Sequence, residues 1–220
     1  MKKENRKAFC CSLCMLAAFL LWTTAIRLID VQAIGPQDST VGFATINRFF
    51  HNFTGVHMTL YTITDWLSIL PLVCVMGFAL YGLIQWIQRK RICNVDFSIL
   101  VLGGFYIVVM AVFVLFEVLV VNYRPILIQG NLEASYPSST TMLVMCVMPT
   151  ALMQFRIRIR KPILRRLITA AITAFTAFMV IGRLICGVHW LTDIIGGALL
   201  SAGLVLMYQV IIRNNDKKWV

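Results

Sequence analysis

The sequence predicts an all-α integral membrane protein, a single membrane domain over residues 1–220 that crosses the bilayer six times with both termini in the cytoplasm. Three observations predict this fold. Of the 220 residues, 60% are hydrophobic and 13% are charged, whereas soluble domains are about 45–50% apolar and about 25% charged. Six apolar runs are long enough to span a bilayer, and the basic residues alternate between the two sides of these runs. The composition excludes a soluble globular protein and a disordered one.

The six predicted spans follow from the length of the apolar runs, because a helix needs about 20 apolar residues to cross the hydrocarbon. They are Ala8–Ile29, Trp66–Ile87 (with a start nearer Leu60 as an alternative), Phe97–Val121, Thr140–Phe155, Leu167–Gly182 and Trp190–Ile212. The first run is too long for a signal-peptide core, so we expect a retained helix. The fourth and fifth are short, and flanking Arg, Ser and Thr side chains extend them by snorkelling or by continuation of the helix.

The basic residues predict the orientation. The net charge is +11, and 16 of the 20 Lys and Arg fall on one side of the alternating spans. These are Lys2, Lys3, Arg6, Lys7, Arg89, Lys90, Arg91, Arg156, Arg158, Arg160, Lys161, Arg165, Arg166, Arg213, Lys217 and Lys218. Cytoplasmic loops collect Lys and Arg, so this side is predicted to be cytoplasmic, and Arg27, Arg48, Arg124 and Arg183 lie on the outer side. A nucleic-acid partner is excluded, because the cations are spread over four short pieces.

Residues 30–60 form the longest outer loop. Phe43, Ile46, Phe49, Phe50 and Phe53 recur at helical spacing with polar residues between them. This pattern predicts a short amphipathic helix lying in the membrane interface, either as a connector or as a cover for a site. The seven cysteines are odd in number and fall mostly inside apolar runs, so they act as small apolar residues rather than as a disulfide framework. No metal-ligand cluster is evident, and no cofactor is expected.

Four polar segments are predicted to reach the outer boundary together. They are residues 122–125 after the third run, 135–141 at the start of the fourth, 182–183 at the end of the fifth, and 189–193 at the start of the sixth. Ionisable residues at membrane depth are costly and indicate function. The charge pattern and the polar cluster are separate observations, and both identify the outer face as the site.

Each of these segments suits phosphate chemistry. Arg124 and Arg183 are planar, permanently charged groups that match phosphate oxygens. Hydroxyls and free backbone N–H groups at Ser138, Ser139 and Thr140 make a natural anion site at a helix N-terminus, although Ser138 is equally a plain N-cap.

His189 and Asp193 are four residues apart and share a face on a helix. The carboxylate is expected to accept the Nδ1 proton of the imidazole and leave Nε2 free as a nucleophile, the plain alternative being an interfacial hydrogen bond. With the two arginines and the hydroxyl-rich helix start, this pair points to phosphoryl transfer through a phosphohistidine.

Residues 60–212 resemble the type 2 phosphatidic acid phosphatase superfamily, related to acid phosphatases and vanadium haloperoxidases, and residues 117–193 carry its three motifs. The family motifs are K-x6-R-P, P-S-G-H and S-R-x5-H-x3-D. The corresponding segments here read Glu117-x6-Arg124-Pro125, then Pro137-Ser138-Ser139-Thr140, then Gly182-Arg183-x5-His189-x3-Asp193. The resemblance implies that His189 is the nucleophile and Asp193 its orienting partner. Arg124, Arg183, Ser138, Ser139 and Thr140 then bind the phosphate, and no metal is needed.

Two departures from the motifs bear on activity. Glu117 stands where the family has lysine. Three roles are open to it: a general acid, a carboxyl protonated because it is buried, or an ion-pair partner of Arg124 or Arg183. Thr140 replaces the histidine that protonates the leaving group, and threonine cannot do this at neutral pH. Glu133 is another candidate acid.

Three interpretations follow. The protein is a lipid phosphatase with an altered acid, or it acts on a diphosphate such as undecaprenyl diphosphate, whose leaving group needs little protonation. The diphosphate argument also allows phosphotransfer to an acceptor lipid. In the third interpretation it is catalytically degenerate and binds or carries phospholipid. A transporter that uses Glu117 and Asp65 as proton-relay carboxylates is a separate class, disfavoured because no inverted repeat is visible.

The expected partners are the bilayer and a lipid phosphate substrate. The expected location is the plasma membrane of a bacterium, with the site facing outside. The sequence leaves the lipid and the oligomeric state undetermined.

Overall fold

The computed structural model describes residues 3–215. Lys2, Lys217 and Lys218, three of the basic residues assigned to the cytoplasmic side, lie outside this range. Within it, six helical segments are long and apolar enough to cross a membrane: Lys3–Leu28, Met58–Arg89, Phe97–Val118, Ser139–Arg158, Pro162–Ile185 and Leu191–Asn215. The predicted helical membrane fold, with six candidate spans, is therefore confirmed.

The elements follow one another in a simple order. They are α1 (Lys3–Leu28), β1 (Gln32–Ala33), η1 (Pro36–Asp38), β2 (Thr40–Val41), α2 (Ala44–Thr54), α3 (Met58–Leu67), α4 (Ile69–Arg89), η2 (Ile92–Asn94), α5 (Phe97–Val118), α6 (Ser139–Arg158), α7 (Pro162–Ile185) and α8 (Leu191–Asn215). The strands β1 and β2 pair antiparallel, with Gln32 opposite Val41 and Ala33 opposite Thr40.

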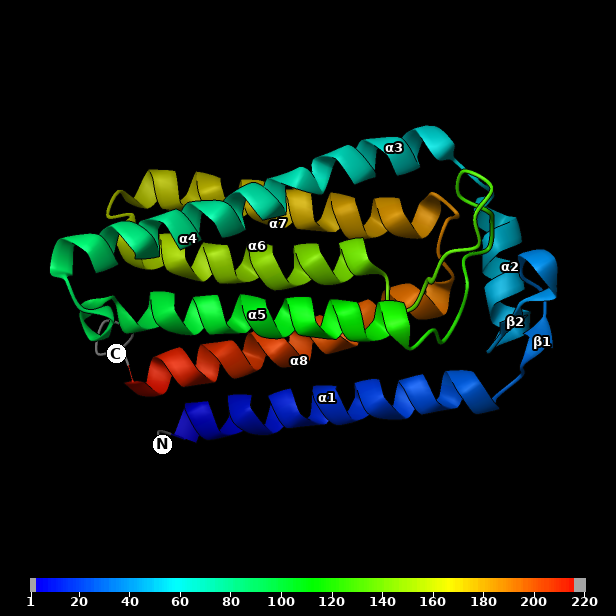
Figure 1. Ribbon diagram of the computed structural model, residues 1–220, viewed down its shortest axis with the longest axis horizontal. Helices are drawn as coiled ribbons and strands as arrows, with labels where there is room; N and C mark the ends of the chain where they lie inside the picture. Colours follow the sequence, from blue (N-terminus) through cyan, green and yellow to red (C-terminus); the bar gives the residue numbers. More distant parts are fainter. Residues whose placement is uncertain (1–2, 216–220) are drawn as a thin grey trace.

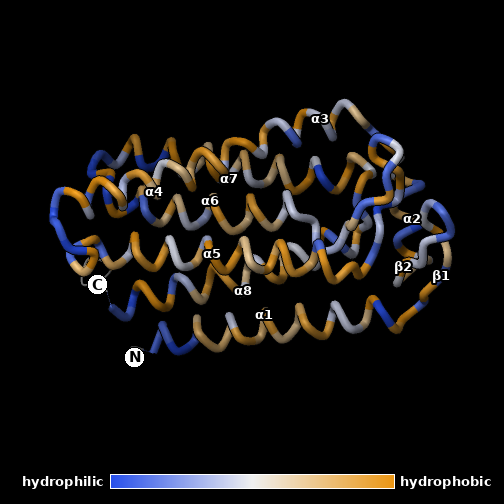
Figure 2. Tube along the Cα trace, in the orientation of Figure 1, coloured by the Kyte–Doolittle hydropathy of each residue, from blue (hydrophilic) through white to orange (hydrophobic). Residues whose placement is uncertain are grey.

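The long helices run side by side, and both ends of the chain lie at one end of the bundle (Figure 1). The helix α2, the β1–β2 hairpin and the loop between α5 and α6 cover the opposite end. The helices α6 and α8 are the most buried of the six segments and pack against each other. Figure 2 shows apolar colour along the middle of the helices and more polar colour toward their ends, as expected for a bundle that spans a bilayer.

A close approach of α1 and α8 depends on Gly203. A Cβ atom added at this position would lie 2.7 Å from Cδ2 of Leu16. The Ser12 hydroxyl donates to the Gly203 carbonyl at 2.7 Å. Small residues and interhelical hydrogen bonds of this kind hold membrane helices together, because lipid provides no hydrophobic drive for helix association.

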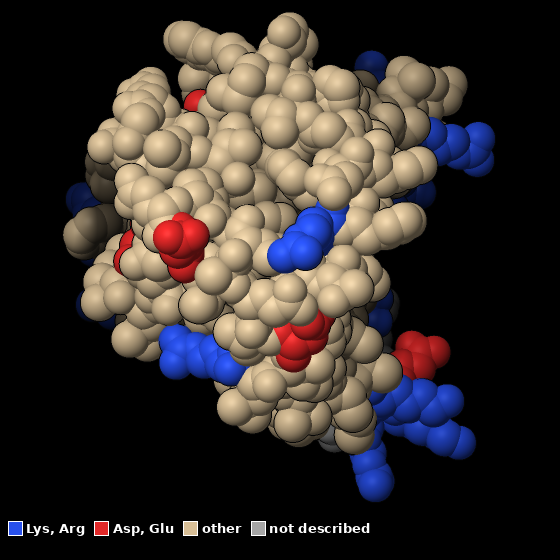
Figure 3. All heavy atoms as spheres, turned by 90° about the vertical axis from the view of Figure 1, so that its right-hand side faces the viewer, with Lys and Arg blue, Asp and Glu red and all other residues tan. Residues whose placement is uncertain are grey.

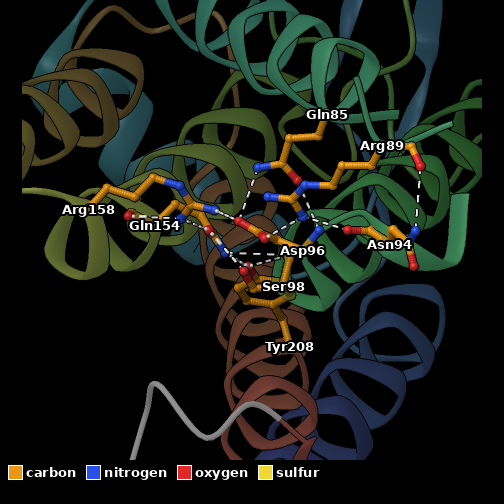
Figure 4. A network of polar contacts seen from close by, with 8 residues as sticks. All are labelled: Gln85, Arg89, Asn94, Asp96, Ser98, Gln154, Arg158 and Tyr208. Atoms are coloured by element: carbon orange, nitrogen blue, oxygen red, sulfur yellow. Dashed lines mark hydrogen bonds and ion pairs between the residues drawn. The ribbon is translucent and has the colours of Figure 1, made fainter. Parts of the chain in front are cut away.

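A polar network ties the helices together at the end of the bundle that carries the termini (Figure 4). The carboxylate of Asp96, just before α5, forms ion pairs with Arg89 at 3.0 Å and Arg158 at 3.5 Å. The Tyr208 hydroxyl on α8 donates to the Ser98 carbonyl at 3.3 Å. The network therefore links α4, α5, α6 and α8 and fixes the bundle far from the candidate site.

Several boundaries differ from the predicted ones. The second span begins at Met58, and Ser68 divides it into α3 and α4. The Ser68 hydroxyl donates to the Asp65 carbonyl at 2.5 Å and satisfies part of the helix end. The α5 helix ends at Val118 rather than Val121, because the backbone of Leu119 leaves the helical conformation. The β1–β2 hairpin was not predicted, since two-residue strands carry no detectable alternation.

The helix α2 occupies part of the loop predicted to hold an amphipathic helix. Phe49 and Phe53 are 69% and 78% exposed, and their rings stack on each other. On the opposite face, the buried Asn47 amide donates to the Gly42 carbonyl and to the Thr192 hydroxyl of α8. The polar face of α2 thus docks on the bundle and leaves the phenylalanines outside.

Candidate functional site

The four polar segments singled out in the sequence meet at the end of the bundle that α2 covers. Arg124 lies in the α5–α6 loop, Ser138 precedes α6, Arg183 lies in the last turn of α7, and His189 precedes α8. The Ser138 backbone N–H donates to the carbonyl of Asp193 at 3.1 Å, which joins the start of α6 to the start of α8. The structure therefore brings these segments together.

His189 is held from both sides of its ring. An Arg124 guanidinium nitrogen lies 3.3 Å from Nε2, and the Ser135 hydroxyl lies 3.0 Å from Nδ1. Arginine is only a donor, so Nε2 must be the acceptor, and the ring proton sits on Nδ1. Nδ1–H then donates to Ser135 Oγ, and the Ser135 hydroxyl donates to Asp193 Oδ2 at 2.5 Å. The neutral imidazole turns its Nε2 lone pair toward Arg124.

This arrangement corrects the predicted His189–Asp193 contact. The distance from Nδ1 to Oδ2 is 3.9 Å, too long for a direct hydrogen bond. The two residues also do not share a helix, because His189 lies before α8 starts at Leu191. Ser135 fills the gap between them and is a site residue to which the sequence analysis gave no role.

Asp193 is fully buried and fully used as an acceptor. Besides the Ser135 hydroxyl, it accepts the Trp190 backbone N–H at 2.9 Å and the Asn122 amide at 3.3 Å. These donors compensate the cost of burying a carboxylate. Asn122 was noted only as part of a polar segment, and nothing in its spacing signals this contact.

The α5–α6 loop folds back on itself to deliver Ser135. Its two limbs are joined by backbone hydrogen bonds from Ser135 to Asn122 at 2.9 Å and from Arg124 to Glu133 at 3.0 Å. The next residue, Tyr136, packs over Gly196 of α8, where an added Cβ atom would lie 2.4 Å from the tyrosine ring. The loop is thus anchored on α8 beside the histidine.

The buried surroundings keep His189 neutral. Burial is the largest effect on its ring and lowers its pKa to about 4. The carboxylate of Asp193 opposes this shift, while the positive charges of Arg124 and Arg183 support it. A neutral imidazole near pH 7 is the form that can act as a nucleophile.

Arg183 is 2% exposed and is held from three sides. One terminal nitrogen donates to Asp65 at 3.0 Å and to the Thr140 hydroxyl at 2.5 Å. The guanidinium carbon also lies 4.9 Å from the centre of the Tyr61 ring. Its Nε and other terminal nitrogen have no hydrogen-bond partner in residues 3–215. Buried, unpaired donors of this kind are suited to an anionic ligand.

The predicted partners of the two arginines need correction. Arg124 pairs with Glu133 at 3.0 Å, and Arg183 pairs with Asp65 at 3.0 Å. Glu117 forms an ion pair with neither, nor with any other residue that the structure describes. It is also exposed in the structure, not buried.

The start of α6 offers donors to a ligand. Ser138 occupies the N-cap position, but its side chain makes no capping hydrogen bond. Its fully buried hydroxyl and that of Thr141 find no partner within the described chain. Ser138 is therefore the N-cap residue by position, but its hydroxyl does not cap the helix. Ser139 lies beside these groups, whereas the Thr140 hydroxyl accepts from Arg183.

Two hollows approach these groups. A small one is lined by Glu117, Ser135, Ser139 and His189 together with apolar residues of α5 and α6. A second, of about 390 Å³, runs between α4, α5 and α6 and reaches Asp65, Ser139 and Thr140 at its polar end. Ser139 lines both. Apolar walls with a few convergent polar groups are typical of ligand sites.

Comparison with known proteins supports a phosphatase-like bundle. Residues 118–217 match the model of the PAP2 superfamily. The solved structure described as the first transmembrane PAP2 type phosphatidylglycerolphosphate phosphatase from Bacillus subtilis is similar, with a TM-score of 0.60 and 17% sequence identity over 94% of this chain and 98% of that one. At this identity the likeness concerns the fold. Comparison with curated proteins gives no match.

Proposed function

Since the chain belongs to the PAP2 superfamily, we propose that it is an integral membrane lipid phosphatase that uses His189 as its nucleophile. The substrate is a phospholipid or a polyprenyl phosphate or diphosphate, and the intermediate is a phosphohistidine. The observation that carries the proposal is the His189 ring itself, whose Nε2 lone pair faces Arg124 while Nδ1–H is held by Ser135.

The first step is attack of Nε2 on phosphorus. Arg124, the unpaired nitrogens of Arg183 and the Ser138 hydroxyl are suited to bind the phosphate oxygens, as electrostatic stabilisation of the transition state requires. Positive charge develops on the imidazole as the P–N bond forms. Ser135 Oγ accepts from Nδ1–H and donates to Asp193, so that the buried carboxylate stabilises this charge through the hydroxyl. Water then attacks the phosphohistidine and releases phosphate.

The leaving group is where the substrate classes differ. An alkoxide needs a proton, and Thr140, in the family's histidine position, only accepts a hydrogen bond from Arg183. Glu133 is ion-paired with Arg124, and Glu117 lines the hollow beside His189. When a diphosphate is cleaved, the leaving group is a phosphate whose second pKa is about 6. Such a leaving group needs little acid catalysis. This difference favours a diphosphate, or transfer of the phosphoryl group to an acceptor lipid.

The access route is from the bilayer. The hollow between α4, α5 and α6 is apolar over most of its length, with Leu72, Val75 and Val109 among its walls, and it ends at Ser139 and Thr140. A lipid chain lying there would place its head group at the start of α6. This route agrees with a substrate that never leaves the membrane.

The orientation is also part of the proposal. Both termini lie at one end of the bundle and the site at the other, and most Lys and Arg belong to the end with the termini. By the positive-inside rule the site faces outward. The proposed location is a bacterial plasma membrane, with residues 117–193 as the catalytic region and α2 in the interface.

A second candidate function is phospholipid binding or carriage without turnover. The observation in its favour is that no acid occupies position 140. Phosphate release from lipid monophosphates and diphosphates by the purified protein separates the two functions.

In this assay, His189→Ala should abolish release. His57→Ala should not, because the ring of exposed His57 contacts the Thr54 carbonyl and none of the site residues. If the wild-type protein and His189→Ala release equal amounts of phosphate from every lipid, the result supports phospholipid binding without turnover. Turnover of monophosphates alone would contradict the diphosphate argument.

A further inference from the structure

We propose that the site selects lipid phosphates whose head group also carries an ammonium group, and that Glu117 recognises this ammonium. The inference rests on the proposed phosphatase function and, among the substrates named there, points to phospholipids with an amine beside the phosphate rather than to polyprenyl diphosphates. It concerns a positive charge on the head group of the substrate, which neither the fold nor the family motifs specify.

The charge balance of the site is unusual for a phosphate pocket. Each phosphate-binding arginine already has a carboxylate partner, Asp65 for Arg183 and Glu133 for Arg124. The arginine side chains are 3% and 11% exposed, whereas those of Asp65 and Glu133 are 56% and 41% exposed. In these two ion pairs the positive charge lies deep in the site and the negative charge lies at its rim, while the buried carboxylate of Asp193 accepts from Ser135. Glu117 adds a further carboxylate that no cation compensates in residues 3–215.

The position of Glu117 ties this extra charge to the ligand. It lies in the last turn of α5 and lines the same small hollow as His189, Ser135 and Ser139. A carboxylate close to a bound phosphate repels it and weakens binding unless the ligand brings a cation of its own. A substrate with an ammonium next to its phosphate turns this repulsion into attraction.

The donors deeper in the site complement such a ligand. The unpaired nitrogens of Arg183 and the unpaired Ser138 hydroxyl require an anion deep in the site. The bilayer-side hollow is lined by Asp65 at its polar end and shares Ser139 with the hollow of Glu117. Figure 3 shows this end of the molecule as mostly uncharged, with separate acidic and basic groups rather than one basic face. A zwitterionic head group fits this distribution better than a purely anionic one.

A matched pair of lipids tests the inference. Sphinganine 1-phosphate has an ammonium close to its phosphate, and N-acetylsphinganine 1-phosphate has an uncharged amide in the same place. Phosphate release from each is measured in chelator, so that no divalent cation replaces the ammonium. The wild-type protein should favour the amine by about fivefold in kcat/KM, as expected for a solvent-accessible ion pair.

Variants separate recognition from other roles of Glu117. Glu117→Gln should bring the ratio close to one, and Glu117→Lys, which restores the family's residue, should reverse it. The matched control is Asp38→Asn, which removes an exposed carboxylate of the outer loop, and it should leave the ratio unchanged. If Glu117 acts instead as a general acid, Glu117→Gln lowers kcat on both lipids equally and the ratio persists, which would overturn the inference.

Failure of the inference and failure of the proposed function give different results. A wild-type ratio near one, or a preference that appears only with added Mg²⁺, would contradict ammonium recognition while leaving a working phosphatase. If neither lipid releases phosphate above His189→Ala, the binding of the same two lipids, measured as shifts in thermal stability, decides the question. Stronger stabilisation by the amine that is lost in Glu117→Gln would support ammonium recognition, and equal stabilisation would contradict it.

Discussion

At the scale of single residues, Ser135 determines how His189 and Asp193 act together. Its hydroxyl is the only connection that the described chain offers between Nδ1 and the carboxylate, which are 3.9 Å apart. Ser135→Ala should therefore lower kcat by roughly tenfold to hundredfold, the usual effect of losing an orienting partner. KM should change little, because Ser135 positions the nucleophile rather than the phosphate.

Two further variants separate this role from general stability. Ser135→Thr keeps the hydroxyl and should recover most of kcat. The double variant Ser135→Ala/Asp193→Asn should be little worse than either single variant, since both interrupt one chain of hydrogen bonds. Fully additive losses in single-turnover kinetics would show that the two residues act independently.

The neutral state of His189 gives a pH prediction. Burial, with the charges of Arg124 and Arg183, lowers its pKa to about 4 against the opposing effect of Asp193. As the pH falls from 6.5 toward 4, an unfolded chain takes up this proton before the folded chain, so folding stability decreases across that window. In kcat/KM, which reports the free enzyme, the acidic limb should lie near pH 4. A limb near pH 6.5 would contradict a buried, neutral nucleophile.

At the scale of elements, the contact of the α5–α6 loop with α8 places Ser135. Tyr136 packs on Gly196 so closely that an added Cβ atom would overlap its ring. Gly196→Ala should thus displace the loop, cost about 1–3 kcal/mol of stability and lower activity. Gly104→Ala is the control, because nothing lies within 4 Å of a Cβ atom there. Equal thermal stability and activity of the two variants would show that the Tyr136–Gly196 contact does not position the site.

The helix elements also show what the sequence can and cannot predict. Long apolar runs specify their helices directly, because only intrahelical hydrogen bonds satisfy the backbone in lipid. The division of the second span at Ser68 and the hairpin at residues 32–41 depend on local hydrogen bonds that leave no periodic signal. The site is similar: motif spacing indicated Arg124, Arg183 and His189, whereas the bridging Ser135 lies in a loop whose folding back cannot be read from periodicity.

The charged residues of the site show the same limit. Their types were readable from the sequence, but their pairing was not. Asp65 joins Arg183 across a separation of 118 residues, and Glu117 stays without an ion pair in the part of the chain described. Such contacts are decided by which helices pack together, and a single sequence does not specify that.

At the scale of the whole molecule, the account predicts that the chain is oriented with its termini inside and its site outside. A green fluorescent protein fused to the C-terminus should fluoresce, and an alkaline phosphatase fused there should be inactive. The first reporter matures in the cytoplasm, and the second is active only outside it. Fusions placed in the outer loop near Asp38 should give the opposite pair of results. The reverse pattern would place the site in the cytoplasm and contradict the positive-inside argument.

The central claim is that His189 carries the phosphoryl group during turnover. Phosphohistidine is stable in alkali and labile in acid. The protein is therefore mixed with a lipid phosphate that it hydrolyses, quenched in alkali, digested and examined by mass spectrometry. A phosphoryl group is expected on the peptide containing His189, with its loss on acid treatment and its absence from His189→Ala. Turnover without phosphorylation of this peptide, or phosphorylation that persists in His189→Ala, would contradict it.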